Sequence, residues 1–308
     1  MSLRTVLEQA SHRLVIRRRL PPPFTAARIY ASSEGGLRYL RPRMDRVDPE
    51  LLGLVTEIVR PGNMIWDIGA NVGLFSFAAA VAAGPDGRVL SVEPDTVLVR
   101  LLRRSVASCA QQAPIEVFPA AVAEKCGVAR FYIARRNRST NHLDGFGSTQ
   151  TGGVRASELV PTVSLDWLAA HFPQPDVIKI DVEGAEAQVL AGGPAVLRAR
   201  PRIICEVAKR NAAEVGNLLA ALDYSLYDGD QPNGHRFPLG EAPYNTLAIS
   251  GPWPNGISLS WDRQEPEFDL RERCQPCRFA VLSKFSQPVV GVAPHPTFTF
   301  MSDCASWI

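Results

Sequence analysis

Short apolar runs alternate with longer segments of helical periodicity through the middle of the chain. The runs are rich in Val and Ile and predict strands at 64–68, 89–93, 115–122, 128–133, 177–184 and 203–207, with a last one at 245–249. Between them, apolar residues recur every three or four positions and predict helices at 72–83, 96–110, 185–197 and 212–222. Strands and helices that alternate in this order predict an α/β fold, with a parallel sheet covered on both faces.

The segments outside this alternation are less regular. Residues 27–30 and 37–40 alternate apolar and polar side chains around a Ser/Gly turn and predict a hairpin, and 51–59 has the period of a helix. The polar segment 137–153 predicts a long loop, of the kind that serves as a lid or a binding loop. We therefore expect three parts, namely a poorly ordered basic arm at 1–26, a main domain with an N-terminal cap at 27–250, and an irregular tail at 251–308.

Composition narrows the class of protein. The chain has 308 residues, of which 46% are hydrophobic and 21% charged, so that it is long enough to bury a sizeable core. No apolar run approaches the length of about 20 residues that crosses a bilayer, and the first residues lack the apolar block of a secretory signal, so we expect a cytoplasmic location. The six cysteines are thinly spread and require no oxidising compartment.

The net charge of +2 conceals a basic N-terminal region. Residues 1–46 contain ten arginines and three acidic residues, and Arg17, Arg18 and Arg19 are consecutive. Such a cluster contacts an acidic membrane surface or a phosphorylated substrate, or it forms a solvated arm, which is the commoner case. No aromatic residues interleave with the arginines as single-strand binding requires, so no nucleic acid partner is predicted.

The segment from Asp67 to Gly73, after the first predicted strand, indicates a nucleotide-cofactor site. Gly69 and Gly73 let the backbone pass close to a ligand, and Asn71 lies between them. Asp67 places an acid where a dinucleotide fold receives a pyrophosphate, and a negative charge there favours a cationic ligand such as S-adenosylmethionine. The alternative is that the glycines only serve a tight turn between strand and helix.

An acidic residue ends the second predicted strand, twenty residues after Gly73. This residue is Glu93, and Pro94 follows it. A doubly wound fold places at this point the carboxylate that accepts hydrogen bonds from ribose hydroxyls, so we expect Glu93 and Pro94 to bind the cofactor. The alternative is that Glu93 is an ordinary carboxylate at the start of a helix.

Four charged residues on later strands are candidates for the chemistry. Methyl transfer to a hydroxyl is an in-line displacement, in which the protein aligns the nucleophile and helps to remove its proton. Asp181 and Lys179 share one face of a central strand, and we expect Asp181 to be the base. For Lys179 and Glu206 the alternative is a structural ion pair, and for Glu183 it is the capping of a helix. A further alternative is that the carboxylates of Asp181, Glu183 and Glu206 together bind a divalent cation, although no histidine at a suitable spacing supports a metal site.

These motifs together resemble the FkbM family of S-adenosylmethionine-dependent methyltransferases. The resemblance spans 29–249 and rests on the segments 67–73, 92–94, 164–166, 179–184 and 200–206. It implies a class I, Rossmann-like fold with seven mostly parallel strands, the last of them antiparallel, and adenine contacts at Ala121. Pro119 stands where the family usually has Asn, and the chain after Ile249 has no counterpart in the family.

The resemblance also implies an activity. Members of the family act mostly on hydroxyls of sugars, glycolipids or polyketides, so we expect an O-methyltransferase whose acceptor is a glycan or a small molecule such as a secondary metabolite. Two alternatives are a nicotinamide-dependent oxidoreductase, which the first turn disfavours, and a cofactor-binding regulatory module without activity. The sequence predicts no particular oligomeric state.

Overall fold

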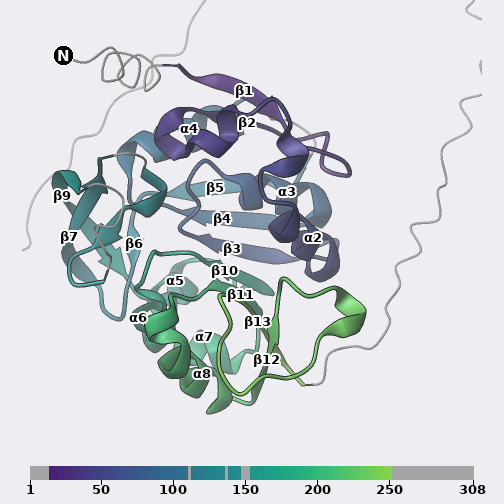
Figure 1. Ribbon diagram of the computed structural model, residues 1–308, viewed down its shortest axis with the longest axis vertical. Helices are drawn as coiled ribbons and strands as arrows, with labels where there is room; N and C mark the ends of the chain where they lie inside the picture. Colours follow the sequence, from purple (N-terminus) through teal and green to yellow (C-terminus); the bar gives the residue numbers. More distant parts are fainter. Residues whose placement is uncertain (1–13, 110–111, 136–137, 147–152, 252–308) are drawn as a thin grey trace, which may run out of the picture. The chain divides into compact units, whose positions relative to one another are not determined.

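A seven-stranded sheet forms the centre of the computed structural model, in the order β12–β13–β11–β10–β3–β4–β5 (Figure 1). The structure describes residues 14–109, 112–135, 138–146 and 153–251, which belong to the first of two units, 1–257 and 258–308. The strands are β3 (Met64–Ile68), β4 (Arg88–Val92), β5 (Ile115–Phe118), β10 (Val177–Ile180), β11 (Arg202–Glu206), β12 (Tyr224–Asp228) and β13 (Asn245–Ser250). Within this sheet β13 alone runs opposite to the other six strands, so the expected class I methyltransferase topology is confirmed.

Helices cover both faces of the sheet, as the alternation predicts. One apolar core includes α2 (Pro49–Ile58), α3 (Leu74–Ala83) and α4 (Thr96–Val106), and the other includes α5 (Leu165–His171), α6 (Glu186–Ala191), α7 (Pro194–Arg198) and α8 (Ala212–Ala220). Because side chains alternate along a strand, Ile65 of β3 enters the first core and Trp66 the second. By the same alternation Asp67 belongs to the face of Ile65, and it lies in register with Lys179 of β10.

A second sheet has four strands in the order β6–β9–β7–β8. These strands are β6 (Ala121–Val122), β7 (Gly127–Ala134), β8 (His142–Leu143) and β9 (Val154–Val163). The predicted loop at 137–153 contains β8 and the short 3-10 helix η4 (Arg138–Thr140), and its residues 137 and 147–152 lie outside the described parts of the chain. No apolar alternation marks β9 in the sequence, because most of its side chains are exposed.

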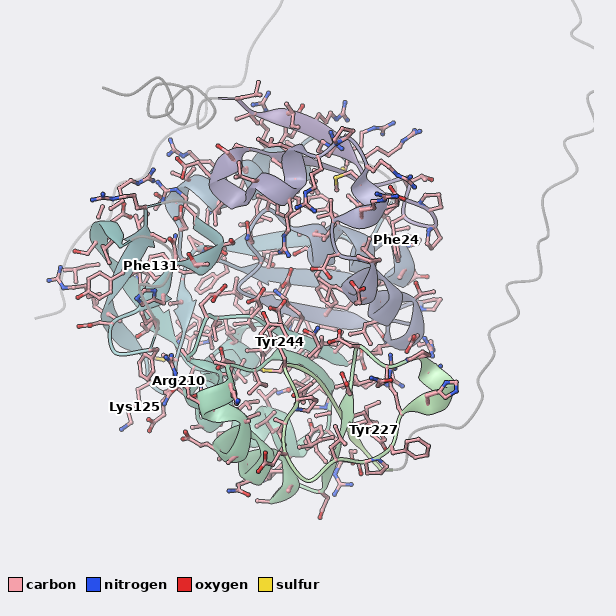
Figure 2. The ribbon with its side chains drawn as sticks, in the orientation of Figure 1. Phe24, Lys125, Phe131, Arg210, Tyr227 and Tyr244 are labelled. Atoms are coloured by element: carbon pink, nitrogen blue, oxygen red, sulfur yellow. The ribbon has the colours of Figure 1, made fainter. Side chains whose placement is uncertain are left out.

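The N-terminal segment differs from the predicted hairpin. β1 (Ile16–Arg19) pairs with β2 (Arg28–Ala31), and the 3-10 helices η1 (Ser33–Gly35), η2 (Leu37–Leu40) and η3 (Met44–Arg46) follow. The hairpin prediction is wrong because β2 pairs with β1 instead, and two buried apolar residues of the connection between them, Leu20 and Phe24, pack into the core. Phe24 is labelled in Figure 2. Residues 14–26 of the expected arm therefore pack on the domain, whereas 1–13 lie outside the described residues.

The remaining differences from the sequence-based expectations are local. The helix expected at 185–197 is divided into α6 and α7 at two glycines, and β12 lies in a segment expected to consist of turns. The expected tail lies outside the described residues from position 252 onward. Among the helices that the structure describes, none is long and apolar enough to cross a membrane.

Candidate active site

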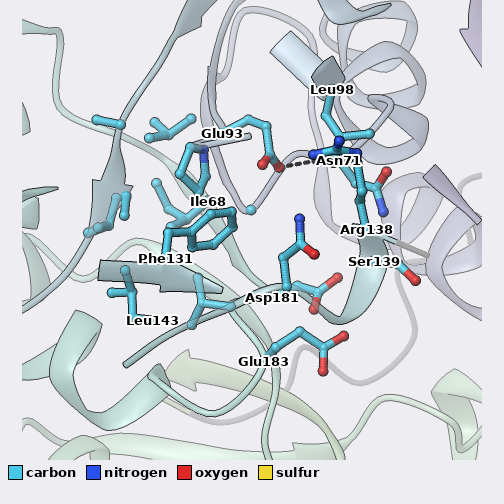
Figure 3. A pocket seen from close by; sticks show the side chains of 18 residues that line it. Ile68, Asn71, Glu93, Leu98, Phe131, Arg138, Ser139, Leu143, Asp181 and Glu183 are labelled. Carbon is cyan, nitrogen blue, oxygen red and sulfur yellow. Dashed lines mark hydrogen bonds between the residues drawn. The ribbon is translucent and has the colours of Figure 1, made fainter. Parts of the chain in front are cut away.

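A first cavity opens at the carboxyl ends of β3 and β4 (Figure 3). Gly69 and Asn71, in the turn after β3, line it with left-handed φ angles of 79° and 52°. A side chain at Gly69 would collide with the carbonyl oxygen of Asp181, so only glycine allows this close approach of two chain segments. Two residues expected to bind a cofactor therefore lie on the cavity wall.

Glu93 and Pro94 line the same cavity from the end of β4. The Glu93 carboxylate accepts hydrogen bonds from the backbone amides of Asn71, at 2.8 Å, and Asp95, at 2.9 Å. Burial raises the pKa of Glu93 to about 7, although these two hydrogen bonds lower it. Asn71 Nδ2 donates to the carbonyl oxygen of Gly35 at 3.2 Å, so this side chain ties the turn after β3 to the N-terminal segment beside the cavity.

The other side of the first cavity is apolar. It is lined by Ala120, Ala121 and Val122 at β6, by Phe131 of β7 and by Leu143 of β8. Ala121 is the position that the family resemblance implies, whereas no motif marks Phe131 or Leu143, which the second sheet brings to the cavity. An apolar wall opposite a carboxylate suits a flat heterocyclic base joined to a hydroxylated sugar.

An ion network joins the second sheet to the N-terminal segment beside the first cavity. Arg138 donates from Nε to Glu34 Oε2 at 2.5 Å and from Nη1 to Asp95 Oδ2 at 2.5 Å. Asn141 Nδ2 also donates to Asp95 Oδ2, at 2.8 Å, and Arg155 pairs with Glu34. Arg138 and Asn141 line the cavity, yet no sequence motif marks them, since Arg138 lies 104 positions from Glu34.

Two residues expected to contact the cofactor do not line the first cavity. Asp67 is fully buried, accepts a hydrogen bond from Ser76 Oγ at 2.5 Å, and lies 3.5 Å from Lys179 Nζ. Burial raises the pKa of Asp67. Gly73 precedes α3 with a φ of 91°, and a side chain there would collide with side chains of α3 and α4. Asp67 and Gly73 thus support the turn through contacts inside the protein and do not line the cavity.

Lys179 is a buried cation next to this turn. Its Nζ donates to the carbonyl oxygen of Gly69 and to Asp181 Oδ2, both at 3.1 Å. Burial disfavours its charge, but the carboxylates of Asp181, Asp67 and Glu206 raise its pKa above the ordinary value. Lys179 therefore stays protonated, and its ion-pair partners are Asp181 and Asp67 rather than Glu206.

A second cavity, of about 520 Å³, borders on Lys179. Lys179 and Glu206 line it from β10 and β11, Tyr244 lines it from the segment before β13 (Figure 2), and Arg38 lines it from the N-terminal segment. Asp181 lines the first cavity and accepts the hydrogen bond of Lys179. The Lys179–Asp181 ion pair thus connects the walls of the two cavities.

The three candidate carboxylates are distributed over both cavities. Glu183 lines the first with a left-handed φ of 54°, and partial burial together with the charges of Asp181 and Glu206 raises its pKa to about 8. It does not cap α6, whose N-cap residue is Ala185 and whose first turn receives no capping side-chain hydrogen bond. Glu206 lines the second cavity, accepts a hydrogen bond from the Tyr244 hydroxyl at 2.8 Å, and has a pKa raised by burial. In the described ranges no three acidic, His or Cys side chains converge to hold a metal ion.

A family model, a curated relative and solved structures are similar to this chain. A model of the methyltransferase FkbM domain matches residues 67–231, which is more than half of the chain. The hexuronic acid methyltransferase AglP of Haloferax volcanii is 27% identical over 167 residues, which cover 53% of this chain and 63% of AglP, so the chain spans less than two thirds of that relative. Precorrin-6y C5,15-methyltransferase of Geobacter metallireducens is a solved structure with 12% identity and a TM-score of 0.38, covering 68% of this chain and 88% of its own. A tRNA (uracil-54, C5)-methyltransferase of Pyrococcus abyssi has 15% identity and a TM-score of 0.38, covering 76% of this chain and 43% of its own.

Proposed function

The chain belongs to the FkbM family of methyltransferases, and on this premise we propose that it transfers the methyl group of S-adenosylmethionine to a hydroxyl of a saccharide, a glycolipid or a secondary metabolite. The observation that carries the proposal is that two cavities meet at the Lys179–Asp181 ion pair, at the carboxyl ends of the central parallel strands. Ligands of doubly wound folds bind at this edge of the sheet. A donor in one cavity and an acceptor in the other have their reacting groups brought together there.

S-adenosylmethionine is the cofactor of this family, and the residues of the first cavity fit it. The Glu93 carboxylate suits ribose hydroxyls, because each oxygen accepts one backbone amide and has a second lone pair left. The apolar wall with Phe131 and Leu143 suits adenine. When bound, the cofactor supplies an electrophilic methyl group on a sulfonium.

In the proposed mechanism Asp181 accepts the proton of the acceptor hydroxyl. Lys179 Nζ holds Oδ2 of Asp181 at 3.1 Å, which orients the carboxylate and leaves Oδ1 for the hydroxyl. Lys179 itself stays protonated, so it positions the base and does not act as one. Glu183 is the second candidate for the base, since a pKa of about 8 suits proton transfer near neutral pH.

The second cavity is the proposed acceptor site. Arg38 and Glu206 give it charged hydrogen-bonding groups, and Tyr244 presents an aromatic side chain that is 62% exposed. Polar groups beside an aromatic ring suit a hydroxylated ring, which has both polar edges and an apolar face. The name of AglP, a hexuronic acid methyltransferase, supports a saccharide in this role.

Calorimetric titration with S-adenosylhomocysteine and with nicotinamide adenine dinucleotide tests the cofactor. We expect the first to bind and the second not to, and the reverse result would support the oxidoreductase alternative instead. Incubation with labelled S-adenosylmethionine and a panel of hydroxylated glycans then tests the reaction. Label in a glycan supports the proposal, whereas cofactor binding without transfer to any acceptor would support the regulatory alternative.

A further inference from the structure

An arginine-lined groove runs beside β1, outside the two cavities. Its lining includes Arg17, Arg18 and Arg19 of β1 and Arg43 just before η3, and Asp45 is the one acidic residue among the described residues that line it. Arg17 and Arg19 are exposed. The groove therefore concentrates positive charge at the surface.

The groove is held in shape by the chain around it. β1 is fixed by its pairing with β2, and Arg18 donates from Nη2 to the carbonyl oxygens of Arg41, at 2.5 Å, and Pro42, at 2.9 Å. Arg43 pairs with Asp45 at 2.6 Å, whereas no carboxylate of a described residue pairs with the three arginines of β1. Arg17 likewise donates from Nη2 to the carbonyl oxygen of Ser108, at 3.2 Å. Carbonyl oxygens do not neutralise a guanidinium, so a bound anion or salt compensates the positive charge of these arginines.

The groove adjoins the proposed acceptor site. Asp45 lines both the groove and the second cavity, and Arg46, the next residue, lines the second cavity as well. A molecule that places one part in the second cavity thus has a path for an attached group into the groove. The charge of the groove requires that this attached group be an anion.

We propose that the acceptor is a saccharide that carries a phosphate, with the sugar in the second cavity and the phosphate in the groove at Arg17 and Arg19. This inference rests on the proposed function, which places the acceptor in the second cavity. The planar forks of guanidinium groups match the oxygens of a phosphate and form charge-assisted hydrogen bonds with them. The phosphate belongs to a soluble nucleotide sugar or to a lipid-linked sugar, which share this chemistry.

The test uses the full-length protein and two double variants. Arg17→Gln/Arg19→Gln removes two charges of the groove, and Arg100→Gln/Arg103→Gln removes two exposed charges of α4 that do not line it. Calorimetry measures the binding of uridine diphosphate glucose, with glucose as the probe that lacks phosphate. Co-sedimentation measures the binding of phosphatidylcholine vesicles with and without dolichyl phosphate. S-adenosylhomocysteine is titrated into each protein as a control.

We expect the wild type to bind uridine diphosphate glucose or the dolichyl phosphate vesicles, and the groove variant to bind that probe about tenfold more weakly. Binding of the nucleotide sugar identifies a soluble source, and retention on dolichyl phosphate vesicles alone identifies a lipid-linked one. The proposal is overturned if neither phosphate probe binds better than its phosphate-free counterpart, or if both double variants lose binding equally. A wild type that does not bind S-adenosylhomocysteine contradicts the proposed function instead, and the groove is then judged from the phosphate probes alone.

Discussion

The two cavities differ in how the chain assembles them. Gly69, Asn71 and Glu93 of the first cavity come from one strand–helix–strand unit, whereas Arg38, Lys179 and Tyr244 of the second come from segments far apart in the sequence. Contiguous motifs supply the wall of the first cavity that holds Glu93, because the turn after one strand and the end of the next already adjoin it, whereas the opposite, apolar wall depends on the second sheet. The acceptor site depends on topology and on the N-terminal segment, which leaves its chemistry open to variation.

The cavities have one structural element in common, the Lys179–Asp181 ion pair. Substitutions in this pair are expected to affect both cavities, and substitutions elsewhere to affect one cavity alone.

Replacement of Lys179 by methionine removes the cation between the cavities. Asp67 and Asp181 then lose their partner, and the fully buried Asp67 carboxylate is left uncompensated. We expect the free energy of unfolding to fall by about 3 to 5 kcal/mol, as for one broken member of a buried ion pair. Urea unfolding measures this, with Lys125→Met, at a lysine whose side chain is 83% exposed, as the matched control. Equal stability of the two variants would show that Lys179 has no such role.

The first cavity is expected to make stability depend on pH through Glu93. Burial raises the pKa of Glu93 from 4.5 to about 7, so between these values the folded protein holds a proton that the unfolded chain has lost. The free energy of unfolding therefore falls as pH rises through this window, by about 3 kcal/mol from this group. Thermal unfolding from pH 4.5 to 8 should show a flatter profile for Glu93→Gln than for the control Glu116→Gln, at an exposed position of β5. Superimposable profiles would refute the prediction.

Removal of the Glu93 carboxylate is expected to weaken the cofactor alone. Glu93→Ala loses a charged acceptor in the first cavity, so S-adenosylhomocysteine should bind about 1 to 3 kcal/mol more weakly. Glu206→Ala, which changes a carboxylate of the second cavity, should bind it with unchanged affinity. Calorimetry on both variants makes the comparison, and equal losses would mean that the two cavities are not functionally separate.

Tyr244→Phe tests the second cavity by removing one hydroxyl. The Tyr244 hydroxyl donates to Glu206 at 2.8 Å, and its loss leaves that carboxylate free to rotate. We expect the KM for the acceptor to rise about fivefold, which corresponds to about 1 kcal/mol, the usual contribution of a hydrogen bond. The affinity for S-adenosylhomocysteine should not change, and a change in that affinity with an unaltered KM would assign Tyr244 to the cofactor instead.

Most of the central sheet and much of the first cavity follow from the sequence. The strand preceding Gly69 and the strand ending in Glu93 have strong apolar patterns, and the glycine turn between them admits few conformations. Phe131 and Arg138 were not predictable in the same way, because they reach the cavity through the second sheet. The pairing of β7 with the largely exposed β9, and the ion pair of Arg138 with Glu34, depend on long-range contacts that no local pattern encodes.

The roles of Asp67 and Lys179 show a second limit of local patterns. A strand period of two places Lys179 and Asp181 on one face, which agrees with their ion pair. The same period does not reveal that Asp67, on the neighbouring strand, pairs with Lys179. That pairing requires the register of the two parallel strands, which depends on packing. Asp67 therefore looks like a ligand residue in the sequence and is a partner of Lys179 in the structure.

The turnover of Asp181→Asn decides whether the meeting point of the two cavities is where the methyl group is transferred. This variant keeps the shape of the side chain at the meeting point of the two cavities and removes its capacity to accept a proton. We predict that it binds S-adenosylhomocysteine with nearly the affinity of the wild type and transfers methyl groups about 100-fold more slowly, the usual scale for a positioned general base. Turnover equal to that of the wild type would contradict the account and leave Asp181 as a structural partner of Lys179.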